Sequence, residues 1–261
     1  MKLIITENNV GLLAATYIKD RINKFSPCAQ KPFVIALPTG GTSLDMYKHL
    51  IAFYKEGRLS FKNLVSFNLD EYADFDINNP QSYHSFMRRN FFEHVDMQPQ
   101  NINIPDGNAQ DAAAFCRAYE DKIKSLGGIE LLLGGVGTNG HIAFNEPGSS
   151  FESRARLVDL QDRTLKDNAR FFGGDAGAVP KRAITMGLGT ILEAREIIIM
   201  ATGANKAQAV YKAVESKPDT AWPITALQRH DNACLVVDTA AASEVSTAAA
   251  REHCACSFGN I

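Results

Sequence analysis

The sequence predicts an α/β fold in which a mostly parallel sheet is covered by helices on both faces. Three observations point to it. Short apolar segments alternate with longer amphipathic ones along the chain, an order typical of a parallel sheet. Three of the short segments are apolar at consecutive positions, as strands buried on both faces are. Glycine and proline punctuate the joints and no stretch resembles an interdomain linker, so we expect a single domain over residues 1–261.

The individual elements follow from the spacing of apolar residues. Apolar, β-rich runs predict strands at residues 2–6, 32–37, 64–69, 129–136, 196–201 and 233–237. Helical periodicity predicts helices at residues 10–25, 43–56, 82–94, 111–126, 206–215 and 240–253. Residues 157–181 fit neither pattern, because they are polar and rich in glycine. A loop longer than about 15 residues is usually a functional lid or disordered, so this segment is either a mobile lid or a floppy insertion.

Composition excludes several classes of protein. The chain has 45% hydrophobic and 21% charged residues, which is near the globular average and argues against disorder. No apolar run approaches the roughly 18 residues that would span a bilayer, so no membrane partner is expected. The net charge is −2, which does not indicate a nucleic-acid partner but leaves room for a small anionic substrate.

The five cysteines indicate reduced thiols in a cytoplasmic protein. Their number is odd, they form no CxxC pair, and the amino-terminal segment is too short for a signal-peptide core. Cys254 and Cys256 could chelate a soft metal, but no nearby cluster completes a tetrahedral set, so no metal is expected.

The first candidate site is the joint between the predicted strand 32–37 and the following helix. In open parallel sheets, ligands bind beyond the carboxyl ends of the strands. Gly40 and Gly41 would let backbone N–H groups close on an anion at the positive end of the helix. Thr39, Thr42 and Ser43 would add hydroxyl donors. The alternative is an ordinary tight turn with a Thr or Ser N-cap.

Two more joints carry charged residues. Asp70 and Glu71 follow a predicted strand, and alternation would send their carboxylates to opposite faces. One could act as a general base, although a capping acid at a strand end is equally ordinary. Lys206 opens the helix 206–215, where a cation is unfavourable to the helix dipole. It suggests an anionic ligand, with a solvated surface lysine as the alternative.

Residues 134–148 form a further joint, which is rich in glycine and contains a histidine and a glutamate. Three of their glycines match GxGxxG, but that fingerprint must open a helix, and Asn145 and Pro147 would break one within a few residues. We therefore expect no dinucleotide. The segment places His141 five residues before Glu146 in a glycine-flanked loop. An imidazole near a carboxylate is a proton-transfer pair that titrates near neutrality, whereas a lone His would more often be structural.

Together these segments resemble the glucosamine-6-phosphate deaminases. The resemblance is carried by LPTGGT, FNLDEY, GHIAFNEPGSS and the NARFF of residues 168–172, and it extends in the same order to about Asp238. It implies a modified Rossmann-like α/β sandwich without a cofactor, which agrees with rejecting GxGxxG. It also implies the family reaction, which converts glucosamine 6-phosphate and water to fructose 6-phosphate and ammonium.

The resemblance implies roles for individual residues. Asp70 would shuttle the proton between C-2 and C-1, and His141 would open the sugar ring with support from Asn139 and Glu146. Many members carry Asp where Asn139 stands, so here Glu146 must supply the anionic support. The substrate phosphate would be held by the glycine-containing loop and two cations, namely Thr39, Gly40, Gly41, Thr42, Ser43, Arg170 and Lys206.

Two other functions remain open. The 6-phosphogluconolactonases share the fold, but their loop does not continue as Phe-Asn-Glu-Pro. Sugar-phosphate-sensing transcription regulators carry a related domain, but they need an amino-terminal DNA-binding module, and here the first strand begins at Lys2. Family members range from monomers to hexamers, so a homo-oligomer is a possible partner state.

The resemblance also bears on regulation. Hexameric members that respond to N-acetylglucosamine 6-phosphate have a second phosphate site made of two serines, an Arg, a Lys and a Tyr. Ser149, Ser150 and Arg156 match that pattern, whereas Val158 stands at the Lys position and Glu252 falls near the Tyr position. We therefore expect strong activation to be absent.

Overall fold

The computed structural model describes residues 1–253 of the chain. Its strands are β1 (Lys2–Thr6), β2 (Phe33–Leu37), β3 (Leu64–Asn68), β4 (Asp70–Tyr72), β5 (Ile102–Asn103), β6 (Leu131–Gly135), β7 (Arg156–Asp159), β8 (Arg182–Thr185), β9 (Ile197–Ala201) and β10 (Ala233–Asp238). Its α-helices are α1 (Val10–Phe25), α2 (Gly41–Lys55), α3 (Tyr83–Asn90), α4 (Ala112–Ser125), α5 (Asp162–Asn168), α6 (Leu188–Leu192), α7 (Ala207–Glu215) and α8 (Thr247–His253).

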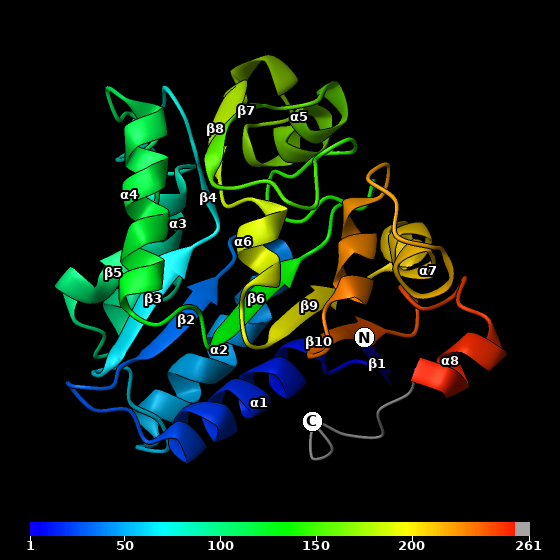
Figure 1. The fold of residues 1–261 in the computed structure, drawn as a ribbon, viewed down its shortest axis with the longest axis horizontal. Helices are drawn as coiled ribbons and strands as arrows, with labels where there is room; N and C mark the ends of the chain where they lie inside the picture. The colour runs from blue at the N-terminus through cyan, green and yellow to red at the C-terminus, as the bar shows by residue number, and fades with distance from the viewer. Residues whose placement is uncertain (254–261) are drawn as a thin grey trace.

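The strands form two sheets. The larger is parallel throughout, in the order β1-β10-β9-β6-β2-β3-β5. The smaller is antiparallel, in the order β4-β8-β7. Figure 1 shows the small sheet and α5 at one end of the molecule, beyond the arrowheads of the large sheet.

Both faces of the large sheet are covered, as the consecutive apolar residues of its strands predict. In β9, Ile198 and Met200 pack with α1 and α2, whereas Ile197 and Ile199 pack on the other face with α4, α6 and α7. Successive side chains of a strand point to opposite faces, so a strand buried on both sides must be apolar at every position. The predicted fold class is confirmed.

The strand order creates a crevice between β2 and β6. These strands are neighbours, but the chain leaves β2 toward β3 and leaves β6 toward β9 on the other side. Their outgoing loops therefore diverge, and ligands of open α/β sheets bind at such a switch point. The loops that diverge here are residues 38–40 and 136–140, both of which the sequence singled out.

The predicted bounds of two helices were wrong. The predicted helix at 82–94 ends at Asn90, because Phe91 turns out of the helix at φ −147° and a 3₁₀ turn follows. The predicted helix at 240–253 is helical only from Thr247. Its first part is a turn in which the amide of Ala241 donates to a carboxylate oxygen of Asp238 at 2.7 Å.

The segment 157–181 is not the irregular loop that its composition suggests. It contains most of β7 and all of α5, followed by 3₁₀ turns at Ala169–Phe171 and Ala176–Ala178. Leu160, Ala169 and Val179 are buried in a small apolar cluster with Tyr72 and Phe144. The apolar residues are too sparse to show a period, yet tertiary packing against the small sheet fixes short elements here.

The described residues add little beyond the sheet and its helices. Cys28 is exposed, Cys116 and Cys234 are buried, and all three are free thiols. Cys254 and Cys256 lie outside the described residues. Within residues 1–253, no three His, Cys, Asp or Glu side chains are grouped so that they could hold a metal ion. Among the described helices, none is both long and apolar enough to cross a membrane.

Candidate active site

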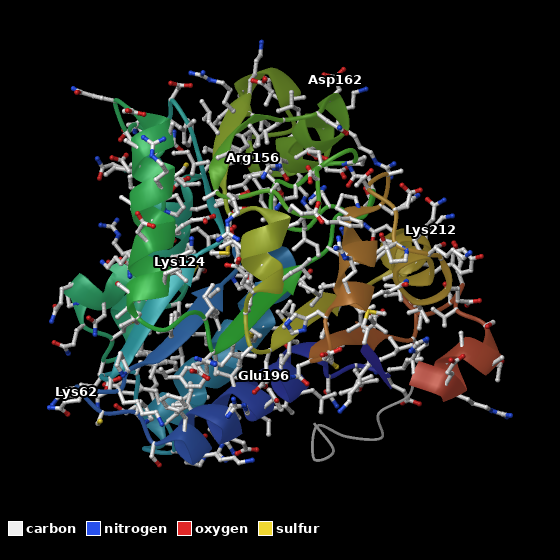
Figure 2. The ribbon with its side chains drawn as sticks, viewed as in Figure 1. Lys62, Lys124, Arg156, Asp162, Glu196 and Lys212 are labelled. Atoms are coloured by element: carbon white, nitrogen blue, oxygen red, sulfur yellow. The ribbon has the colours of Figure 1, made fainter. Side chains whose placement is uncertain are left out.

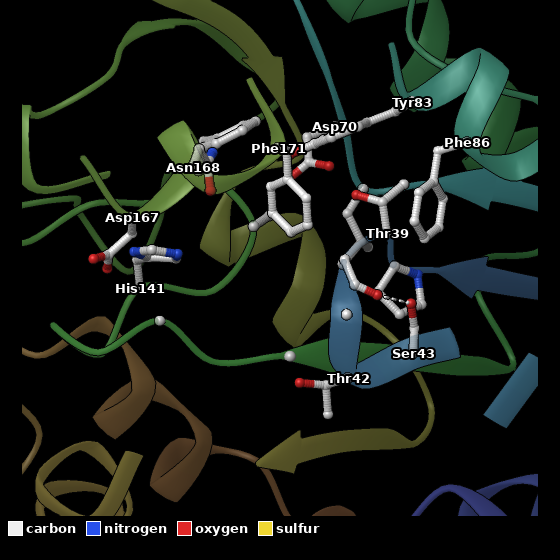
Figure 3. A pocket seen from close by; sticks show the side chains of 18 of the residues that line it. Thr39, Thr42, Ser43, Asp70, Tyr83, Phe86, His141, Asp167, Asn168 and Phe171 are labelled. Atoms are coloured by element: carbon white, nitrogen blue, oxygen red, sulfur yellow. Dashed lines mark hydrogen bonds between the residues drawn. The ribbon is translucent and has the colours of Figure 1, made fainter. Parts of the chain in front are cut away.

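A cavity of about 230 Å³ lies at the carboxyl ends of β2, β6 and β9, between the large sheet and the small one. Figure 3 shows Asp70, His141 and the start of α2 around it. Nine of the eleven residues singled out from the sequence line this cavity: Thr39, Gly40, Gly41, Thr42, Ser43, Asp70, His141, Arg170 and Lys206. The other two, Asn139 and Glu146, lie behind His141. The large sheet and the 3₁₀ turn at Ala169–Phe171 thus bring distant segments to one place.

One wall of the cavity is the start of α2. Gly40 is the N-cap with φ +99°, a conformation that favours glycine, and no side chain caps the helix. The Ser43 hydroxyl donates to the Gly40 carbonyl at 2.7 Å, so it fixes the loop. The first amides of a helix have no acceptor within the helix, so those of Gly41 and Thr42 are available to an anion.

Lys206 reaches the cavity from a second strand-to-helix joint. Gly203 has φ +88°, and its amide donates to the Asp238 carboxylate at 2.9 Å, which ties this loop to the end of β10. Lys206 closes the 3₁₀ turn Ala204–Lys206, one residue before α7, rather than opening the helix as predicted. Burial lowers its pKa, and the charge of Arg170 acts in the same direction, although Asp167 opposes both.

Arg170 comes from the segment between β7 and β8. It lies in the 3₁₀ turn after α5, and its guanidinium stacks over the ring of Phe171 with 4.7 Å to the ring centroid. Arg170 is exposed and lines the cavity. A guanidinium beside an ammonium and a helix amino terminus is suited to a phosphate dianion.

Asp70 is the acidic group of the cavity. It begins β4, opposite Thr185 of β8, and only 7% of it is exposed. Burial, with a smaller contribution from the negative charge of Glu71, raises its pKa to about 8. The neighbouring phenol of Tyr72 is buried too, and its pKa is raised to about 12, so it stays neutral. Asp70 can therefore hold or release a proton near neutral pH.

Glu71 points to the other side of β4, as strand alternation predicts. Its carboxylate is buried and accepts hydrogen bonds from the amides of Tyr83 at 3.0 Å and His84 at 2.8 Å. It therefore receives the first amides of α3 and does not line the cavity. Of the two adjacent carboxylates, only Asp70 faces the site.

His141 is held through an amide. Its Nδ1 lies 2.7 Å from Oδ1 of Asn139, and the amide nitrogen of Asn139 donates to Glu146 at 2.8 Å. The imidazole also lies 3.6 Å from the same Glu146 oxygen. A Cβ on Gly137 would lie 2.2 Å from Cε1 of His141, so the imidazole needs glycine at that position.

Glu146 is the buried anion of this cluster. Burial alone would raise its pKa, but hydrogen bonding and charge from His141, with further hydrogen bonds from Thr164 and Asn139, hold the pKa below its usual value. Thr164 lies on α5, so the segment that carries Arg170 also supports the histidine. No sequence signal pointed to Thr164, because eighteen residues separate it from Glu146.

The loop after His141 is held by a further amide. Asn145 donates to the carbonyls of Ile142 at 3.0 Å and Met186 at 2.8 Å, and it accepts from Arg156 at 3.0 Å. Arg156 lies where β7 runs beside α4 (Figure 2) and also donates to Ser149 at 3.3 Å. Ala143, which lines the cavity, is held at φ +52°, a strained conformation for a residue with a side chain.

Several groups that line the cavity were not predicted as site residues, although some of them lie in the motifs that carry the resemblance. They are mostly aromatic or amide side chains: Tyr72, Tyr83, Phe86, Thr138, Phe144, Asp167, Asn168, Phe171 and Phe172. In a sequence, aromatic residues are normally predicted to lie in the core. Their spacing does not distinguish residues that line a cavity from residues buried in an apolar cluster.

The chain matches a known family over most of its length. The model of the "Glucosamine-6-phosphate isomerases/6-phosphogluconolactonase" family matches residues 6–236. A protein of Tolumonas auensis named glucosamine-6-phosphate deaminase is 54% identical over 236 residues, which are 90% of this chain and 89% of the relative. A protein of Aedes aegypti with the same name is 50% identical over 247 residues, or 94% of this chain and 89% of the relative.

Solved structures agree in fold. The structure of a monomeric glucosamine-6-phosphate deaminase has a TM-score of 0.88 at 40% identity, covering 94% of this chain and all of the other. A 6-phosphogluconolactonase from Trypanosoma cruzi has a TM-score of 0.71 at 19% identity, covering 94% of this chain and 97% of the other, and shows the shared fold alone. The chain thus belongs to the family of glucosamine-6-phosphate isomerases and 6-phosphogluconolactonases.

Proposed function

We propose that this enzyme converts glucosamine 6-phosphate and water into fructose 6-phosphate and ammonium. The observation that carries the proposal is one cavity that combines a proton-transfer carboxyl with a carboxylate-supported imidazole and an anion site. An aldose–ketose isomerisation with loss of an amine needs each of these three parts. Relatives at 50–54% identity that carry the deaminase name support the same reaction.

The substrate phosphate would bind where the cations meet the start of α2. The amides of Gly41 and Thr42 would donate to its oxygens, and Arg170 and Lys206 would neutralise its charge. Since these groups come from two strand ends and from the segment after α5, a bound phosphate would connect the scaffold to that segment.

His141 would open the pyranose ring. It would move a proton between the O-1 hydroxyl and the ring oxygen as the C-1–O-5 bond breaks, which gives the open-chain aldehyde. Glu146 is anionic and buried, so it would stabilise the imidazolium that forms, and Asn139 would orient the ring.

Asp70 would then carry out the isomerisation. Its carboxylate would remove the C-2 proton to give an enolamine and return a proton to C-1, leaving an iminium at C-2. Water would add to C-2, the C–N bond would break, and ammonium would leave as the ketone forms. A carboxyl with a pKa near neutrality suits a group that must both take and give a proton.

The experiment that tests the function measures ammonium release from glucosamine 6-phosphate. A coupled assay for fructose 6-phosphate should show equal amounts of both products. Hydrolysis of 6-phosphogluconolactone, measured in parallel, tests the lactonase alternative, which the family description also covers. Lactone hydrolysis without ammonium release would overturn the proposal. We also infer a cytoplasmic enzyme, since free thiols are typical of a reducing compartment.

A further inference from the structure

A second cavity, of about 590 Å³, lies beside α3 and is separate from the active site. It is lined by residues of α3, α4 and β5, among them His84, Arg88, Phe115, Tyr119 and Lys122. Only His84 among these side chains is bonded to β4, through Glu71. None of the residues that line this cavity belongs to β4 or to the active-site cavity, so it is linked to the strand that carries Asp70 only through His84.

The contact between His84 and Glu71 is short and largely buried. Glu71 is buried, and its carboxylate accepts four hydrogen bonds. Three of them come from the backbone amides of Tyr72, Tyr83 and His84. The fourth joins Nδ1 of His84 to Oε2 of Glu71 at 2.7 Å, and it is the only one made by a side chain.

We propose that His84 is a positioning residue that sets the ionisation of Asp70 through Glu71. The proposal rests on the proposed function, in which Asp70 moves the proton. Asp70 and Glu71 are consecutive in β4 and point to opposite faces, so a change in the effective charge of one carboxylate is felt by the other. His84 touches neither the active-site cavity nor Asp70, and it acts only through its partner.

The physical link is the negative charge of Glu71. That charge is the second cause, after burial, of the raised pKa of Asp70. A donor at 2.7 Å draws electron density from the Glu71 carboxylate and weakens its repulsion of the Asp70 anion. Removing the donor should therefore make Asp70 harder to ionise, whereas removing the Glu71 charge should make it easier.

His84 is open to solvent on the side away from the substrate. About a third of its side chain is exposed, at 32%, whereas that of Glu71 is 2% exposed. Two further charged residues line the same cavity, Arg88 on α3 and Lys122 on α4. Arg88 lies 3.4 Å from Glu93, and Lys122 donates to Asn103 at 2.5 Å. Solvent can therefore reach His84 from outside the active-site cavity.

The test compares three variants by their pH profiles of kcat/KM. His84→Ala removes the donor and should move the acidic limb to higher pH, while His84→Asn keeps an N–H near the position of Nδ1 and should return it toward the wild type. Glu71→Gln removes the charge and should move the limb to lower pH by about one unit. His49→Ala is the matched control and should leave the profile unchanged, because His49 is a half-buried histidine that lies 3.7 Å from Asp45 and does not line the active-site cavity.

A direct measurement separates this proposal from the proposed function. Carbon-13 NMR of labelled aspartate, assigned with Asp70→Asn, follows the Asp70 carboxyl whether or not the protein is active. A lower Tm in His84→Ala with an unmoved Asp70 titration would show that His84 is only structural and would overturn the proposal. A moved titration in a protein without deaminase activity would uphold the link and overturn the function.

Discussion

At the residue scale, the raised pKa of Asp70 suits proton transfer but lowers the stability of the folded protein at neutral pH. Below about pH 4 the carboxyl is protonated in both the folded and the unfolded chain, so its titration does not change the free energy of unfolding. Between pH 4 and about 8 the unfolded chain loses this proton while the folded protein keeps it. Stability therefore falls by up to about 1.4 kcal/mol per pH unit over that window, and levels off above it.

Asp70→Asn should separate the two effects. The amide cannot ionise, so the variant should be about as stable as the wild type near pH 4 and more stable at pH 8, by roughly 2–4 °C for each kcal/mol. Turnover should fall by about 10²–10⁴-fold because the proton-transfer group is lost. Thermal melts across the pH range and kcat at pH 7.5 check both expectations. Near-normal kcat would remove Asp70 from the mechanism.

Gly137 should prove as sensitive as a catalytic side chain. A Cβ there would lie 2.2–2.4 Å from three atoms of the His141 imidazole, so Gly137→Ala must displace the ring. A shift of about 1 Å in a reacting group can reduce turnover by about 10²-fold. If displacement is the cause, Gly137→Ala should add little in a His141→Gln background. Equal losses in both backgrounds would assign Gly137 some other role.

The residues of the active site were predictable to different degrees. Asp70, His141 and the residue 39–43 loop stand at strand ends, where the order of elements alone indicates a ligand site. Thr164 and Phe171 could not be found in this way, because their roles depend on how the segment after β7 folds back onto the sheet. The hydrogen bond from Asn139 to Glu146 likewise needs coordinates, since only the pairing of His141 with Glu146 was expected from their spacing.

At the element scale, the unit formed by β7, α5 and β8 links the phosphate site to the histidine. It carries Arg170, supplies Thr164 to Glu146, and is bonded to the 136–140 loop where Thr138 donates to Asp167 at 3.0 Å. We propose that residues 157–181 act as a lid that a bound phosphate draws onto the scaffold.

Arg170→Ala tests the lid. A charge-assisted hydrogen bond contributes about 1.5–3 kcal/mol, so KM should rise roughly tenfold or more. Hydrogen exchange should show α5 protected by a phosphorylated inhibitor in the wild type and less so in the variant. Arg182→Ala is the control, because Arg182 pairs with exposed Asp74 and does not line the cavity. Unchanged exchange on ligand binding would leave Arg170 as a surface residue.

The elements of the large sheet were easier to predict than those of the small one. Strands such as Ile197–Ala201 are apolar at every position, and this pattern alone predicts them. By contrast, β4 is three residues long and contains two acids, and β7 alternates between half-buried and exposed residues. Such strands are stabilised by pairing with strands that are distant in the sequence. Local sequence therefore does not predict them.

At the scale of the whole molecule, the surroundings of Arg156 bear on regulation. In hexameric relatives, the resemblance assigns the matching arginine to an effector phosphate. Here Arg156 is half-buried and donates to Asn145, Arg154 and Ser149, and Val158 packs beside the small apolar cluster of the β4-β8-β7 sheet. Those bonds support the His141 loop and would compete with a second ligand.

Initial rates against glucosamine 6-phosphate should therefore be hyperbolic. Without a lysine at Val158, an effector phosphate loses a charge-assisted contact, which is about ten- to a hundredfold in affinity. A weakly bound effector cannot shift an equilibrium between two states far. Millimolar N-acetylglucosamine 6-phosphate should leave the curve nearly unchanged. A sigmoidal curve that this ligand makes hyperbolic would contradict the expectation.

The ends of the large sheet have a consequence for synthesis on the ribosome. β1 is an edge strand whose neighbour is β10, the last strand of the sheet, so a growing chain carries residues 2–6 without their neighbour until residue 238 has been made. Pairings that join the two ends of a chain form slowly and leave strand edges open to aggregation meanwhile. A chain terminated before β10 would also lack the Asp238 carboxylate that holds Gly203, so a late nonsense mutation would damage the sheet edge and the Lys206 loop together.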